Sequence, residues 1–469
     1  MNSRACCYGM ALGMLTAAVG PMLAQSAKLV VTEAKLFTMA ADQPEPFDGF
    51  MVIDEGGKLL EVGAGAPGAE WADTPKLDVS GMWILPGFVS AHSHLWQSAW
   101  RGLGADQTLM GWVEALYMEQ AQFAPVEDFY WFTLQGALDH LRHGITTTYN
   151  FNYGAWAQPE FAEVQLKGEM ESGVRFVHGQ NFGGWGQVPT VEEGLASAGS
   201  FIEWIEAEDT GDQMLRVMIN GSAAFRDTAQ AAITEAAVGE RYGIGNHLHI
   251  LESAPEQYEE RSRFRWMVDA GLITERDLMG HFIHVDPWIL SHVIDAGAAI
   301  SWNPLSNGRL ASGTADIPHY LAEGLRVGMG VDGQASADRA DPLENVRIGL
   351  YAVRAKYEDA SVLSPYTVLR LHTWGSADAL GVADQVGSLE VGKFADFVVI
   401  DPTDFGVVFD PYATLAFMAA QEHVAAVYVG GEKRVEAGRL TQHDYRNVGR
   451  EVNKRVIAVR DRAAEESKK

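Results

Sequence analysis

The stretch LPGFVSAHSH, residues 85–94, is a short apolar run that ends in two histidines. An apolar run of this length predicts a buried β-strand. Because alternate side chains of an extended chain share a face, His92 and His94 are expected to point to the same side and to reach one cation. Two histidines at this spacing are weak evidence alone. Their meaning depends on what the rest of the chain places beside them.

Short apolar runs alternate with helical patterns beyond this stretch. The later runs span residues 144–150, 174–179, 216–221, 245–251, 278–285, 298–303 and 327–332, and segments such as 126–142 and 228–242 have helical spacing. Repeated β–α alternation over roughly 280 residues predicts an α/β fold whose parallel sheet closes into a (β/α)8 barrel. A doubly wound open sheet is the alternative, but the sequence lacks the glycine-rich nucleotide loop of that fold.

β-rich segments flank the predicted barrel on both sides. Residues 28–34 and 49–53 precede it, and residues 397–400 and 424–429 follow it with similar composition. We therefore expect the two chain ends to form a small β-sandwich domain beside the barrel. The predicted boundaries are 26–84 and 381–445 for the β domain, 85–380 for the barrel, and 446–469 for a C-terminal helix and tail.

The first 25 residues differ in kind from the rest. Arg4 is their only charged residue, residues 10–23 are apolar, and a small-residue pattern ends at Ala24. This arrangement predicts a cleaved signal peptide over residues 1–25, and hence a periplasmic or secreted protein. The apolar run is short for a membrane span, and no other stretch qualifies.

Composition narrows the chemistry further. Both cysteines, Cys6 and Cys7, lie inside the predicted leader, so the mature chain offers no thiolate, and any metal must be held by histidine and carboxylate. The 62 acidic and 35 basic residues give a formal net charge of −27. Such a surface repels nucleic-acid polymers. We therefore expect no nucleic-acid partner, and the small-molecule substrate that we expect is implied by the resemblance described below.

Three further predicted strands end in residues that a hydrophobic core would not contain. They read HLHILE at 247–252, GHFIH at 280–284 and VGMGVDG at 327–333. Burying a lone imidazole or carboxylate at such a place is costly. Because barrel active sites lie at the carboxyl ends of the strands, these endings predict one convergent site.

The combined pattern resembles the amidohydrolase superfamily. It is most similar to the branch of cytosine, guanine and adenosine-type deaminases and triazine hydrolases. The resemblance rests on LPGF leading into the two histidines, on HILE at 249–252, on His281 and Asp332, and on SWNPLSN at 301–307. It covers almost the whole mature chain. It implies one divalent ion, Zn²⁺ or alternatively Fe²⁺, held by four residues: His92, His94, His249 and Asp332.

The resemblance also implies roles around that ion. The ion would provide hydroxide, Asp332 would accept the water's proton, and Glu252 would carry a proton to the ring nitrogen under attack. His281 would hydrogen-bond the attacking water, with His284 as the competing candidate. His247 is expected to face away and His178 to be a structural imidazole.

Several differences from the family pattern limit the reaction and the substrate that we expect. The strand ends at Asn150 and Asn220 offer no lysine to bridge two metals, which favours the one-metal deaminase pattern. No histidine follows Asn220 as it does in adenosine-type relatives, and Trp302 replaces another histidine, so a purine nucleoside is in doubt. The predicted substrate-binding residues are Trp96, Gln97, Trp112, Glu119, Trp302 and Asn303, with core packing as the alternative for the tryptophans.

The leading hypothesis is therefore a metal-dependent hydrolase of carbon–nitrogen bonds other than peptide bonds. It would deaminate a purine-, pyrimidine- or triazine-like ring. Hydrolysis of another leaving group, or opening of a cyclic amide or imidazolone, would use the same site. The alternative of another class is a periplasmic binding protein without catalysis, against which the presence of both Glu252 and His281 argues. The resemblance also makes a homodimer an expectation.

Overall fold

The computed structural model describes residues 26–152, 159–182 and 188–469. Eight parallel strands form its central sheet, in which each strand pairs with its neighbours in the chain. These strands are β6 (Phe88–Ser90), β7 (Ile145–Phe151), β8 (Arg175–Gln180), β9 (Met214–Asn220), β10 (Asn246–Ile250), β11 (Leu278–His281), β12 (Ala299–Trp302) and β13 (Arg326–Met329). The predicted (β/α)8 barrel is confirmed.

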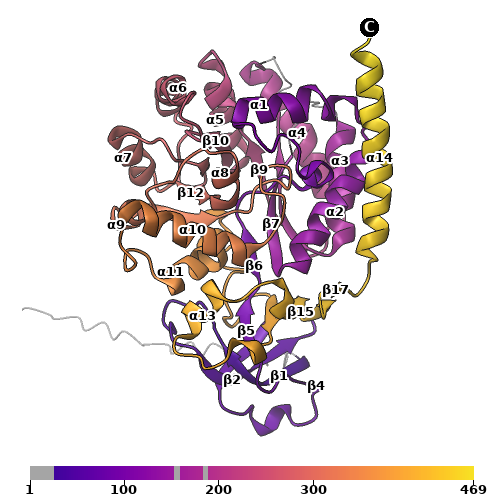
Figure 1. The fold of residues 1–469 in the computed structure, drawn as a ribbon, viewed down its shortest axis with the longest axis vertical. Helices are drawn as coiled ribbons and strands as arrows, with labels where there is room; N and C mark the ends of the chain where they lie inside the picture. Colours follow the sequence, from indigo (N-terminus) through magenta and orange to yellow (C-terminus); the bar gives the residue numbers. More distant parts are fainter. Residues whose placement is uncertain (1–25, 153–158, 183–187) are drawn as a thin grey trace, which may run out of the picture.

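Helices surround this barrel (Figure 1). They are α2 (Asp128–Arg142), α3 (Pro159–Ser172), α4 (Val191–Ala207), α5 (Gln230–Tyr242), α6 (Gln257–Asp269), α7 (Pro287–Asp295), α8 (Pro304–Arg309), α9 (Ile317–Ala322), α10 (Pro342–Tyr357), α11 (Pro365–Arg370) and α12 (Ser376–Ala379). Several begin at an Asp-Pro pair. In α7 and α10, the carboxylates of Asp286 and Asp341 accept hydrogen bonds from two backbone N–H groups of the first turn. The proline needs no partner there, so the pair defines where the helix begins.

The two ends of the chain meet in one mixed sheet below the barrel (Figure 1). The N-terminal end supplies β1 (Ala27–Leu36), β2 (Phe47–Asp54), β3 (Leu59–Ala64), β4 (Lys76–Asp78) and β5 (Trp83–Pro86), and the C-terminal end supplies β14 (Phe397–Ile400), β15 (Val424–Val429), β16 (Glu432–Glu436) and β17 (Arg439–Leu440). β5 and β14 pair antiparallel and join the two halves. The predicted small β domain from both chain ends is confirmed, and its nine strands are hydrogen-bonded into a single sheet.

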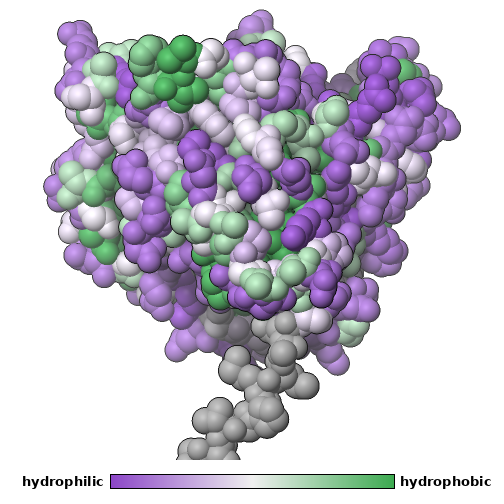
Figure 2. All heavy atoms as spheres, turned by 90° about the horizontal axis from the view of Figure 1, so that it is seen from below, coloured by the Kyte–Doolittle hydropathy of each residue, from purple (hydrophilic) through white to green (hydrophobic). Residues whose placement is uncertain are grey.

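The surface and the C-terminal helix complete the molecule. Seen from below, hydrophilic residues surround scattered hydrophobic patches (Figure 2). Among the described residues, no helix combines the length and apolarity that a membrane crossing requires. The predicted signal peptide lies outside the described residues. After β17, α14 (Tyr445–Glu466) runs along the flank of the barrel and packs on α2 (Figure 1).

The loop before α2 packs between the barrel and α14. It contains a 3-10 helix at Leu95–Trp100, α1 (Leu109–Val113), a π-helical turn at Glu114–Met118 and a 3-10 turn at Ala121–Phe123. Its aromatic side chains form one cluster with Val452 and Val459 of α14. The C-terminal helix therefore helps to hold the loop that follows His94.

Asp139 of α2 connects three of these elements. Its carboxylate is 4% exposed and accepts hydrogen bonds from Arg101 (3.1 Å), Gln334 (2.8 Å) and the Tyr445 hydroxyl (3.1 Å). These donors come from the loop after His94, from the loop after β13, and from the first residue of α14. One buried charge thus fixes the relative positions of three segments that are distant in the sequence.

We predict that Asp139→Ala lowers the free energy of unfolding by about 3 kcal/mol, because it leaves buried donors unpaired. Urea titration followed by fluorescence measures this. Glu163→Ala is the control, since it removes an exposed ion pair with Lys167 and should leave the urea midpoint nearly unchanged. Equal midpoints for the two variants would contradict a central role for Asp139.

Candidate metal centre

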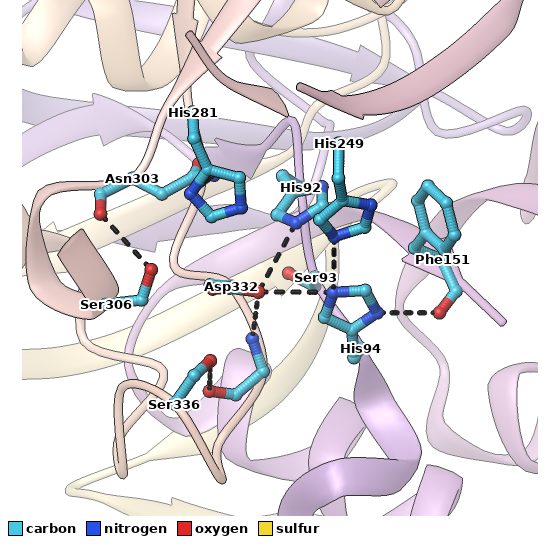
Figure 3. Close-up of polar contacts among 12 residues, drawn as sticks. His92, Ser93, His94, Phe151, His249, His281, Asn303, Ser306, Asp332 and Ser336 are labelled. Carbon is cyan, nitrogen blue, oxygen red and sulfur yellow. Dashed lines mark hydrogen bonds and ion pairs between the residues drawn. The ribbon is translucent and has the colours of Figure 1, made fainter. Parts of the chain in front are cut away.

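Four strand ends bring their polar side chains together at one end of the barrel. His92 and His94 follow β6, His249 lies in β10, His281 ends β11, and Asp332 follows β13. Figure 3 shows the imidazoles around the Asp332 carboxylate. All five side chains are at most 5% exposed. The sequence-predicted cluster is therefore assembled in the structure.

The distances among these groups suit a metal ion. Oδ1 of Asp332 lies 3.3 Å from Nε2 of His92 and 3.2 Å from Nε2 of His94, and Nε2 of His249 lies 3.2 Å from Nε2 of His94. Ligand atoms of a tetrahedral ion with bonds of 2.0–2.1 Å are about 3.3 Å apart. The ligand atoms of His92, His94 and Asp332 lie within 4.8 Å of one another, and so do those of His92, His249 and His281. Either group of three could hold a metal ion, and the two groups share His92.

The outer ring nitrogens of His92 and His94 both have polar partners. Nδ1 of His94 lies 2.8 Å from the carbonyl oxygen of Phe151 (Figure 3), and a carbonyl can only accept, so this nitrogen carries the proton. Nδ1 of His92 lies 3.0 Å from Nε2 of His247, and the tautomers of the two rings decide which of them donates. Such partners orient metal-binding histidines and fix their tautomers.

The expectation that His247 faces away from the site is wrong. Its ring is fully buried and packs against His92 and Tyr149. The reason is the period of the strand, since His247 and His249 are two residues apart in β10 and share its inner face. His247 therefore supports the ring of a candidate ligand.

Burial controls the charge of the cluster. Burial and the nearby imidazoles hold the pKa of His249 well below its ordinary value, and burial lowers the pKa of His281 to about 3. Burial alone would raise the pKa of Asp332, but its contacts with the rings of His92 and His94 outweigh burial and hold that pKa well below the usual range. The surroundings thus favour an ionised Asp332 beside neutral rings of His249 and His281, and a cation requires ligands in these states.

Glu252 lies at the edge of the cluster in a different state. Its Oε2 is 3.5 Å from Nε2 of His281, and its Oε1 accepts a hydrogen bond of 3.2 Å from the Ser312 hydroxyl. Burial, together with the charges of Asp332 and Glu260, raises the pKa of Glu252 well above its ordinary value. Glu252 is therefore a neutral acid that holds a proton beside the candidate metal ligands.

Two asparagines fix the orientation of His281. Nδ2 of Asn307 donates to Nδ1 of His281 at 2.8 Å, and Nδ2 of Asn303 approaches the same atom at 3.4 Å. The amide of Asn303 is oriented by the Ser301 hydroxyl, which donates to its oxygen. Because Nδ1 accepts these bonds, the proton of the neutral ring is on Nε2. That geometry directs the Nε2–H of His281 toward Glu252, while His281 also belongs, with His92 and His249, to one of the two groups that could hold a metal ion.

The other predicted site residues lie elsewhere. Trp96 packs against Trp100 and Tyr117 in the aromatic cluster, and the indole of Trp112 donates to the Ala335 carbonyl. Trp302 is 1% exposed and packs against Gly349 of α10, at a distance that leaves no room for a Cβ there. The structure thus places these tryptophans in the core, as the alternative interpretation had it.

Gln97 and Glu119 differ in environment. Gln97 is buried and donates to the Tyr117 hydroxyl at 3.0 Å, whereas Glu119 is exposed at the end of the π-helical turn.

Two other histidines that the sequence singled out have partners of their own. His284 donates to the carbonyl of Ser312, and the ring of His178 is buried, with Nδ1 2.8 Å from the Glu169 carboxylate. Neither histidine is part of the cluster.

Sequence reasoning missed the supporting residues Asn307 and Ser312. Asn307 ends the SWNPLSN motif, so its position in a motif was a usable signal. Ser312 reaches Glu252 across 60 residues from an irregular loop, and no pattern in the sequence marks it.

Comparisons with known proteins agree with this fold. The model of the Amidohydrolase family matches residues 83–434. A 5-methylthioadenosine/S-adenosylhomocysteine deaminase from Symbiobacterium thermophilum is 27% identical over 414 residues, which cover 86% of this chain and 92% of the relative.

Solved structures share the fold at lower identity. An adenosine deaminase from Xanthomonas campestris with bound zinc superposes with a TM-score of 0.80 at 22% identity, covering 92% of this chain and 99% of that one. The zinc complex of the atrazine chlorohydrolase TrzN from Arthrobacter aurescens gives a TM-score of 0.80 at 23% identity, covering 91% and 100%. With the family model matching most of the barrel and part of the β domain, the chain belongs to the amidohydrolase family.

Proposed function

We propose that the chain hydrolytically deaminates a purine-, pyrimidine- or triazine-like ring, using one Zn²⁺ held by His92, His94, His249 and Asp332. The observation that carries the proposal is the neutral Glu252 within 3.5 Å of His281, at the edge of the histidine cluster. A site that only held a metal would need neither residue. The deaminase relatives, which this chain matches over most of its length, support the same reaction class.

The protein groups divide the proton transfers among them. When bound, the ion supplies the Lewis acidity that lets a water molecule ionise near neutral pH. Asp332, whose pKa its surroundings hold well below the usual range, would take the proton of that water. Glu252 would give its proton to the ring nitrogen next to the attacked carbon. Nε2–H of His281 would stabilise charge that develops on the incoming oxygen. The proton on Asp332 would then pass to the amino group, which leaves as ammonia, and the added hydroxyl would return a proton to Glu252 as the carbonyl forms.

The role of Glu252 leads to the sharpest test. We expect Glu252→Gln to retain about one equivalent of metal and to lose about 1,000-fold in kcat, because the amide keeps the shape but has no proton to transfer. Elemental analysis and ammonia release on a panel of purines, pyrimidines and triazines measure the two quantities. Glu259→Gln, on the exposed face of α6, is the matched control. If metal and activity fell together in Glu252→Gln, Glu252 would be a ligand and not a proton carrier.

The ligand set makes a separate prediction. Dialysis against a chelator should abolish activity, and Zn²⁺ should restore it. We expect His249→Ala to retain less than about one tenth of an equivalent of metal, since each ligand contributes to a binding energy that depends on the full set. His284→Ala should bind metal normally, because the His284 imidazole donates to the Ser312 carbonyl and belongs to neither candidate metal group. Normal metal content in His249→Ala would refute the proposed set.

We also propose that the protein is exported after cleavage near Ala24. The support is the composition of residues 1–25, with one charge followed by an apolar run and small residues. The prediction is that intact-mass measurement of the protein from an extracytoplasmic fraction gives a chain beginning after about residue 24. A full-length chain confined to the cytoplasm would disprove export.

A further inference from the structure

A half-exposed phenylalanine, Phe225, lies beside the buried histidine cluster. The ring of Phe225 lies 6.5 Å from that of His249, centroid to centroid, and Phe225 is 47% exposed. Phe151, His247 and His281 also contact His249 with their rings, and each is at most 1% exposed. Of these neighbours, only Phe225 is open to solvent.

The turn that carries Phe225 is fixed from several directions. Phe225 ends the 3-10 turn Ala223–Phe225 that follows β9, and the two alanines of this turn are buried. The Glu235 carboxylate accepts hydrogen bonds from the backbone N–H and the hydroxyl of Ser222, at 2.7 and 3.0 Å. The guanidinium of Arg263 donates to the Ala224 carbonyl at 3.1 Å. A large apolar ring is thus held in water on a rigid turn and has not collapsed onto the core.

We infer that Phe225 is a specificity-determining residue that stacks against the flat, conjugated ring of the substrate as it approaches the metal centre. This inference rests on the proposed function and narrows it. A phenyl ring offers a face and no hydrogen bond, so it selects for planarity and not for a particular pattern of donors. Saturated cyclic amides present no such face. The platform therefore favours aromatic heterocycles over ring-opening substrates of the same site.

The test compares Phe225→Leu, which keeps an apolar side chain but removes the aromatic face, with Phe225→Tyr, which keeps the face. For aromatic substrates we expect Phe225→Leu to raise KM about 3- to 10-fold, which corresponds to the loss of one contact between two aromatic rings. The kcat should stay within about twofold of wild type. Phe225→Tyr should remain near wild type. Phe409→Leu is the control and should change neither constant, since Phe409 is 93% exposed on the loop before α13 (Pro411–Phe417).

The outcomes separate this inference from the proposed function. An unchanged KM in Phe225→Leu, or an equal rise for a saturated cyclic amide, would overturn the platform while leaving deamination intact. If the metal-loaded wild type hydrolysed no ring of the panel, deamination would fail. Titration of the same aromatic rings into the metal-loaded wild type and Phe225→Leu would then decide, with weaker binding to the variant supporting the platform. Equal binding, or no binding to either, would overturn it.

Discussion

The backbone hydrogen bond from the N–H of Asp332 to the carbonyl of His92, 2.9 Å long, joins the first and last strands of the barrel. A second bond, from Ala91 to Met329, lies beside it. These bonds close a ring of parallel strands whose ends are distant in the sequence. Because side chains at the carboxyl ends of such strands converge, closure itself brings the Asp332 carboxylate to the two histidines of the first strand. The position of Asp332 beside His92 and His94 therefore depends on closure of the barrel.

Closure creates an electrostatic demand that the surrounding groups meet. A buried carboxylate is costly unless a cation or hydrogen-bond donors lie beside it. The neighbouring imidazoles can provide either, because their ring nitrogens can bind a cation or donate a hydrogen bond. The Phe151 carbonyl, His247 and Asn307 each act on the outer nitrogen of a different ring. The Phe151 carbonyl leaves the Nε2 lone pair of His94 directed inward, whereas Asn307 leaves a proton directed inward at His281. Outer partners thus give two histidines of one cluster opposite hydrogen-bonding roles.

The parts of this arrangement that follow a period were predictable from sequence. Alternation along an extended chain places His92 with His94, and strand ends in barrel order place His249, His281 and Asp332 around them. The same rule, applied consistently, would have turned His247 inward. The supporting contacts of Asn307 and Ser312 come from a short helix and an irregular loop, where no period constrains direction. The roles of the tryptophans could not be predicted either, since the sequence alone does not distinguish a ring packed in the core from one that contacts substrate. Trp302 faces α10 because a glycine at position 349 makes room for it.

Backbone geometry explains why the chemistry lies where the chain leaves the sheet. Leu251, His281 and Asp332 adopt left-handed φ values of 56°, 68° and 59°. Each costs a non-glycine residue about 1–2 kcal/mol, so such bends persist only where the surroundings enforce them. After β10 the enforcement is visible, because the backbone N–H groups of Ile283 and His284 both donate to the Leu251 carbonyl. A straight strand would carry residue 252 onward in the direction of the sheet. The bend instead presents the Glu252 carboxyl beside His281. The strained turn that ends the strand therefore also positions Glu252.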